Sequence, residues 1–165
     1  MRLKDEILQL ARKAGACARI RELEACDTDE QVINLVYRHF DFCAAHHFPP
    51  TSVLVRHSSK LLPHGVCVNS SALLTGREKY AIAGRSACRL EARQYQAPIV
   101  YIKDASTLHV DADGHAIALI EAFNHSEVTI STREYARVVV ILHGGAKLHI
   151  GKIVPDSVKI INKNA

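Results

Sequence analysis

The side chains of this chain that could hold a metal ion are mainly histidines, of which there are ten. His109 and His149 occupy equivalent positions of a repeated segment, but Thr129 stands at the same position between them. If the copies stack as neighbouring strands, the two histidines lie about 9.6 Å apart, which is twice the strand spacing. Zinc–nitrogen bonds of about 2.1 Å cannot join them without other ligands. We therefore predict no metal site and no cofactor.

The carboxylates and nucleophilic side chains form no clear calcium-binding or catalytic site in the sequence either. The run from Asp111 to Gly114 includes two aspartates that could bind calcium, but it lacks the later glutamate of an EF-hand loop. A turn is the simpler interpretation, because Asp and Gly favour turns. There is no G-x-S-x-G segment and no phosphate-binding loop. We predict no catalytic residues and expect a protein that is not an enzyme.

The five cysteines are odd in number and form no C-x-x-C pair. The N-terminus, MRLKDEILQLARK, is charged throughout and does not resemble an export signal, so we expect reduced thiols and a cytoplasmic protein. No stretch approaches the roughly 18 apolar residues of a membrane helix, and we expect no membrane partner. The cysteines are Cys17, Cys26, Cys43, Cys67 and Cys88.

The composition is that of a folded protein, with 48% hydrophobic residues among 165. The net charge of +4 comes from 21 basic and 17 acidic residues, which are spread evenly along the chain. No segment is basic enough to follow a phosphate backbone, so we expect no nucleic-acid partner.

Residues 84–163 consist of four consecutive copies of a 20-residue unit, beginning at Gly84, Asp104, Asn124 and Gly144. These first residues all favour turns. Positions 5 and 7 are apolar while position 6 between them is polar, an alternation typical of a strand with one buried face. Position 5 holds Cys88, Leu108, Val128 and Leu148, and position 7 holds Leu90, Val110, Ile130 and Ile150. Positions 15 and 17 hold Pro98, Ala118, Val138 and Val158, and Val100, Ile120, Val140 and Ile160.

Equivalent residues match in the same chain direction, so stacked copies form parallel strands. We predict a right-handed β-solenoid of about four coils, because parallel crossovers are almost always right-handed. The rivals are a left-handed hexapeptide helix, whose six-residue rhythm is missing, and an antiparallel sandwich. The residues at position 11 favour a turn only in the middle coils; they are Gln94, Gly114, Glu134 and Val154.

Helical patterns occupy the N-terminal part. Apolar spacing predicts helices over residues 3–16, from about Thr28 to Cys43, and over residues 51–62, with one or two turns between 19 and 25. Residues 66–68 resemble a short strand. We therefore predict an α+β protein with a helical segment (1–63), a connecting region (64–83) and solenoid repeats (84–165). We expect the helices to cap the first coil, with contributions from Leu3, Ile7, Val36 or Phe40.

The phrases FDFCAAHHFP and GVCVN, followed by the run NHSEVTISTREYARVVVILHGGAKLHI, resemble a family of small proteins from Bacteroidetes and their phages and prophages. The resemblance covers most of the chain and lies chiefly in the repeat pattern. It implies an N-terminal helical segment, a C-terminal solenoid and an origin in a mobile element. It implies no catalytic residues. Bactofilins are a more distant architectural analogue.

A solenoid has two open ends with apolar cross-sections and strand edges. We expect a structural or protein-interaction protein that forms a homo-oligomer through Leu148, Ile150, Val158 and Ile160 of its last coil, in the cytoplasm or in a virion. One alternative is a module that binds or inhibits a host or phage protein. Another is an enzyme acting on an extended polymer, which would need two carboxylates about 5 to 10 Å apart on one face.

Overall fold

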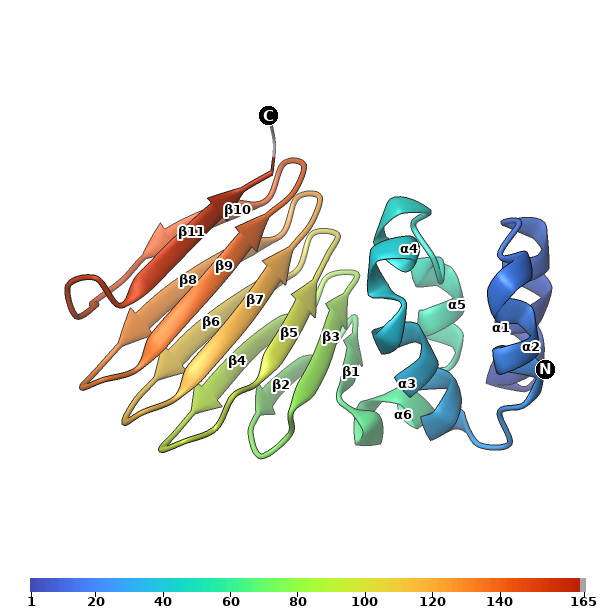
Figure 1. Cartoon of the computed structure of the whole chain (residues 1–165), viewed down its shortest axis with the longest axis horizontal. Helices are drawn as coiled ribbons and strands as arrows, with labels where there is room; N and C mark the ends of the chain where they lie inside the picture. The colour runs from blue at the N-terminus through green and yellow to red at the C-terminus, as the bar shows by residue number, and fades with distance from the viewer. Residues whose placement is uncertain (164–165) are drawn as a thin grey trace. The chain divides into compact units, whose positions relative to one another are not determined.

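The computed structural model describes residues 1–163, apart from the side chains of residues 17, 18, 41 and 45. The chain divides into two compact units, Met1–His64 and Gly65–Ala165. Figure 1 labels their helices and strands. In the described part of the chain, no helix has both the length and the apolar character needed to cross a membrane.

The first unit is helical, as predicted. The predicted helix from Thr28 to Cys43 is interrupted at His39, whose backbone leaves the helical region, and it forms two helices. Thr28 caps the first of them by accepting a hydrogen bond from the Gln31 backbone, and Gln31 completes a capping box. The unit contains α1 (Leu3–Lys13), α2 (Cys17–Glu24), α3 (Asp29–Arg38), α4 (Phe40–Ala45), α5 (Thr51–Arg56), α6 (Ser58–Leu61) and the 3-10 helix η1 (Leu62–His64). Of the residues expected to contribute to a cap, Leu3 and Ile7 are buried, while Val36 and Phe40 are half-buried.

The second unit is a parallel β-solenoid with two facing sheets, which confirms the predicted fold class (Figure 1). Each coil contributes one strand to each sheet. The odd sheet contains β1 (Val66–Val68), β3 (Lys79–Ala83), β5 (Ile99–Ile102), β7 (Ile117–Ala122), β9 (Arg137–Leu142) and β11 (Val158–Asn162). The even sheet contains β2 (Ser71–Leu74), β4 (Ala87–Ala92), β6 (Thr107–Ala112), β8 (Glu127–Thr132) and β10 (Lys147–Ile150).

The solenoid has about five coils and begins earlier than residue 84. Residues 64–83, predicted as a connecting region, include β1, β2 and the whole of β3, which pair within the same two sheets. Val66 pairs with Ala81, whereas Ala87 in the next coil pairs with Thr107, 20 residues further on. The first coil is therefore several residues shorter than the others. This shorter spacing hides it from a search for a 20-residue period.

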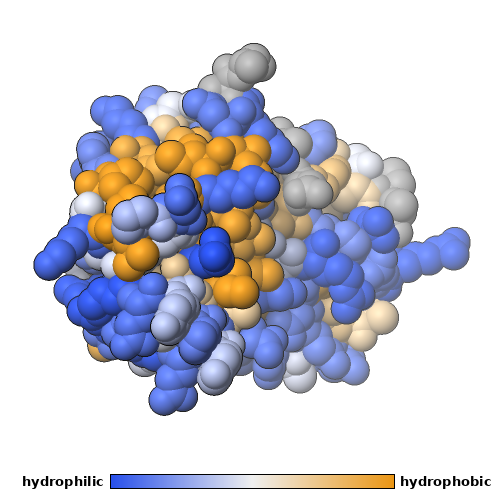
Figure 2. Space-filling view, turned by 60° about the vertical axis from the view of Figure 1, so that its left-hand side comes forward, coloured by the Kyte–Doolittle hydropathy of each residue, from blue (hydrophilic) through white to orange (hydrophobic). Residues whose placement is uncertain are grey.

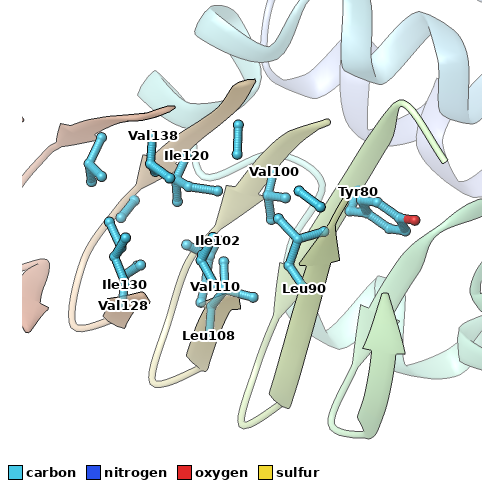
Figure 3. Packing of buried hydrophobic residues seen from close by; sticks show 14 of the residues in the cluster. Tyr80, Leu90, Val100, Ile102, Leu108, Val110, Ile120, Val128, Ile130 and Val138 are labelled. Carbon is cyan, nitrogen blue, oxygen red and sulfur yellow. The ribbon is translucent and has the colours of Figure 1, made fainter. Parts of the chain in front are cut away.

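The core of the solenoid lies between the two sheets and is built from rows of equivalent aliphatic residues. Leu108 stands beside Cys88 on one side and Val128 on the other, as the repeat predicts. Figure 3 shows Leu108 and Val128 facing side chains of the odd sheet, such as Ile120 and Val138, in the space between the sheets. Val128, Ile120 and Val138 are fully buried. Burying such side chains supplies about 1.5–3 kcal/mol each, before the cost of ordering the chain.

Each full coil turns at two corners, and both use left-handed backbone. One corner holds Gly84, Asp104, Asn124 and Gly144 at positive φ, as expected from their types. The turn at position 11 extends beyond the middle coils, because Gln94 has a φ of 52° and Glu134 a φ of 53°. In the last coil the left-handed residue is Asp156, two positions later. Hydrogen bonds between stacked corners, such as Tyr135 N–H to the Gly114 carbonyl at 3.0 Å, impose this geometry on residues that do not favour it.

Replacing Glu134 with glycine should therefore stabilise the protein by about 0.5–1 kcal/mol, because glycine adopts positive φ without a Cβ clash. Denaturant unfolding measures this change. The matched control is Thr107→Gly on an extended strand, which should destabilise by about 0.5–1 kcal/mol. If both variants lose stability equally, backbone strain at Glu134 is not the determining factor.

Candidate functional site

The strongest candidate for an interaction site is the C-terminal coil, formed by β10 and β11. Within residues 1–163, β10 pairs only with β8 and β11 only with β9. The side chains of the coil alternate as in the other coils. Its inward-facing residues are the four predicted to interact, and they stand beside the buried residues Val128, Ile130, Val138 and Val140.

These four residues are more exposed to solvent than the equivalent residues of the preceding coil. Ile130 is fully buried, but Ile150 beside it is 46% exposed. Val140 is fully buried, but Ile160 beside it is 52% exposed. Leu148 and Val158 are half-buried and pack against the core. The coil thus presents an apolar cross-section, and Figure 2, which turns this end forward, shows a broad hydrophobic patch crossed by hydrophilic side chains.

The charges of this coil lie outside its apolar cross-section. Residues 144–163 contain four lysines and one aspartate. Lys147 and Lys159 are at outward positions of β10 and β11, because they pair with the outward residues Glu127 and Val139. Lysines on edge strands discourage uncontrolled strand addition. The coil therefore combines an exposed apolar end with a basic periphery.

Five charged residues surround Asp111 on the outer face of the even sheet. The Asp111 carboxylate lies 3.1 Å from Arg89, 3.2 Å from Arg93 and 3.5 Å from Arg133. Arg133 also pairs with Asp113 at 3.1 Å, and Arg93 with Glu91 at 3.6 Å. Burial raises the pKa of Asp111, but the hydrogen bonds from Arg93 and Arg89 outweigh it and hold the pKa below the ordinary value.

This cluster contains three carboxylates, those of Glu91, Asp111 and Asp113, but their environment disfavours acid–base chemistry on a polymer. A general acid requires a raised pKa, whereas that of Asp111 is lowered. Asp111 and Asp113 both face arginines, which compete with a calcium ion for the same oxygens. Among the described residues, no three His, Cys, Asp or Glu side chains are grouped so as to hold a metal ion.

The histidines of the repeats make local contacts. His149 Nε2 lies 3.3 Å from Glu127, and His143 Nε2 lies 2.8 Å from Glu121. His115 is stacked between the rings of Tyr95 and Tyr135, with centroid distances of 5.0 and 4.9 Å. Sequence analysis missed this ladder, although the three residues all occupy position 12 of the unit. Such a ladder reinforces the coil stack along one corner.

The cysteines with described side chains, Cys26, Cys43, Cys67 and Cys88, are all buried. Cys67 and Cys88 both point into the solenoid core. Hydrogen bonding to Cys67 and burial raise the pKa of the Cys88 thiol. The side chain of Cys17 lies outside the described part.

Comparisons of the chain with family models, with curated proteins and with solved structures found no match. The surfaces, charges and contacts of the chain itself are therefore the basis for a proposal about its function.

The Asp111 cluster should contribute to stability in a pH-dependent way. Asp111→Asn should destabilise the protein at pH 7 by about 1–3 kcal/mol, because hydrogen bonds to a charged group are lost. A carboxylate with a lowered pKa stabilises the fold above its ordinary pKa of about 3.9, and this contribution fades as the pH falls toward its folded value. Denaturant unfolding at pH 7 and near pH 3 should show a smaller difference from the unmodified protein at the lower pH. Asp113→Asn, with fewer arginine contacts, should have a smaller effect, and a difference independent of pH would contradict the assignment.

Proposed function

We propose that this chain is a non-enzymatic structural protein that self-associates through its C-terminal coil. The observation that carries the proposal is the contrast between fully buried Ile130 and Val140 and their exposed neighbours Ile150 and Ile160. An apolar cross-section with edge strands is costly to leave in water. A second copy of the same coil can cover it.

A symmetric pair of coils satisfies both strand edges at once. A two-fold axis perpendicular to the sheets places β11 antiparallel to β11 of the second copy, and β10 antiparallel to its β10. Each sheet then continues across the contact, and the apolar residues of the two last coils face one another. The five residues of β11 and the four of β10 each meet an edge of their own length.

The lysines of the coil do not prevent such a contact. In an antiparallel pair centred on Ile160, Lys159 lies opposite Ile161 of the second copy instead of opposite its own equivalent. Its outward orientation leaves the ammonium group in water. The basic periphery opposes disordered aggregation while the apolar centre favours the symmetric pair.

We also propose a phage or prophage origin, on the resemblance in sequence pattern alone. Phage structural genes on either side of the coding sequence would support it. Ordinary chromosomal genes on both sides would count against it, and they would leave the self-association proposal untouched.

Sedimentation equilibrium tests the self-association. The full chain should form a dimer in the micromolar range, and Ile160→Lys should raise its dissociation constant about 10- to 100-fold. Ile160 is 52% exposed, so about 0.7–1.5 kcal/mol of apolar burial is lost on each side of the contact, or about 1.5–3 kcal/mol in total. Ile150→Lys should act in the same direction. Leu73→Lys is the matched control, because Leu73 is 57% exposed on β2, away from the last coil.

Hydrogen exchange separates loss of association from loss of fold. The amides of β8 and β9 should remain protected in the Ile160→Lys variant if the coil has only lost its partner copy. A monomeric unmodified chain at high concentration, or a dimer that Ile160→Lys and Ile150→Lys leave intact, would overturn the proposal.

A further inference from the structure

The outer face of the odd sheet, which is nearer to the viewer in Figure 1, is an apolar plateau. Its aliphatic residues come from equivalent outward positions of neighbouring strands. Ile117 is 55% exposed, and the others are half-buried by their neighbours within the flat sheet. We define the plateau as Ile99, Ile117, Leu119, Val139, Ile141 and Ile161.

Lysines stand at both ends of two of the rows that run across this face. One row pairs Lys79 with Ile99, continues through Leu119 and Val139, and ends at Lys159. It spans four strand spacings, about 19 Å. A second row, four residues further along the strands, runs from Lys103 through Phe123 and His143 to Lys163, as the backbone hydrogen bonds of these residues show. The row between the two holds Tyr101, Glu121, Ile141 and Ile161. Four lysines therefore border the plateau between these two rows, while Ile117 lies outside the first row beside Arg137.

Negative charge is nearly absent from this face. The strands of the odd sheet contain a single carboxylate, Glu121, whose oxygen lies 2.8 Å from His143 Nε2. The even sheet differs, since its strands carry Glu91, Asp111 and Glu127. One side of the solenoid is thus flat, apolar and basic, while the other is polar and mixed in charge.

We infer that this plateau rests on an anionic lipid surface. A flat apolar area bordered by lysines matches the boundary between acyl chains and anionic headgroups, and each lysine stem can lie along the plateau while its ammonium group reaches a phosphate. A second copy placed face to face is disfavoured, because it would bring the four bordering lysines of each copy, eight like charges in all, close together. The expectation of no membrane partner rested on the lack of a membrane-spanning helix. A peripheral contact needs no such helix, so the inference departs from that expectation.

Co-sedimentation of the full chain with vesicles tests the inference. The chain should bind vesicles of equal parts phosphatidylglycerol and phosphatidylcholine, and bind phosphatidylcholine vesicles at least about tenfold less. Replacing both Lys79 and Lys159 with glutamine should lower the partition coefficient roughly thirtyfold. The matched control replaces Lys147 and Lys152, which are exposed outside the plateau, and should change it less than about threefold.

A second pair of variants tests the apolar contribution without changing the charge. Leu119→Ser should weaken binding to the anionic vesicles about tenfold, whereas Leu73→Ser should leave it unchanged. Circular dichroism should confirm that both variants remain folded.

Three outcomes would overturn the inference. The chain could fail to bind anionic vesicles, it could bind them equally well after the Lys79 and Lys159 changes, or Leu119→Ser could alter the sedimentation mass without altering lipid binding. The last result would assign the plateau to a second copy. Because Ile150→Lys lies outside the plateau, it should leave vesicle binding intact even where it disrupts self-association.

Discussion

The parallel pairing of strands 20 residues apart is the constraint on which the rest of the solenoid depends. It places each inward residue beside its equivalent in the next coil, so the rows must consist of side chains that pack against their own kind. Aliphatic residues meet this requirement in both sheets. The same constraint creates the exposed end, because the coil of β10 and β11 keeps the apolar residues of the repeat while no further coil stacks on it within residues 1–163. Ile130 and Val140 are buried because the last coil stacks on theirs. Ile150 and Ile160 are exposed because no described coil stacks on them.

The register organises polar side chains as strongly as apolar ones. Ser86 and Ser106 stack at one corner, where the Ser106 hydroxyl accepts from the Ser86 backbone at 3.2 Å and donates to the Gly84 carbonyl at 3.0 Å. Tyr95, His115 and Tyr135 stack at the other. Two rows on the outer face of the odd sheet begin and end with lysine. Because each position of the unit recurs in every coil, the side chains at one position line a whole face. Small differences between outward positions therefore produce faces of different chemistry.

Much of the fold follows from the sequence because the repeat is local and periodic. The alternation at positions 5 to 7 predicts both the strands and their buried side, and comparison of copies predicts their parallel pairing. The first coil is missed because its spacing departs from 20 residues. The turn at Gln94 is missed because the backbone bonds of the stack, and not the preference of that residue, determine its φ. The plateau is missed for another reason: net charge summed along a segment averages over two faces that the fold separates.

The edge strands at the two ends of the solenoid differ in length. This difference bears on whether copies stack head to tail or pair through their last coils. Head-to-tail stacking would join the last coil to the first and could continue without limit. The first coil is shorter, however, and β1 has only three residues, all of them buried, against five in β11. In the odd sheet, head-to-tail stacking would therefore join edges of unequal length, whereas in the even sheet β2 and β10 both have four residues. The proposed symmetric pair of last coils would match edge lengths in both sheets, and this favours a closed pair over head-to-tail stacking.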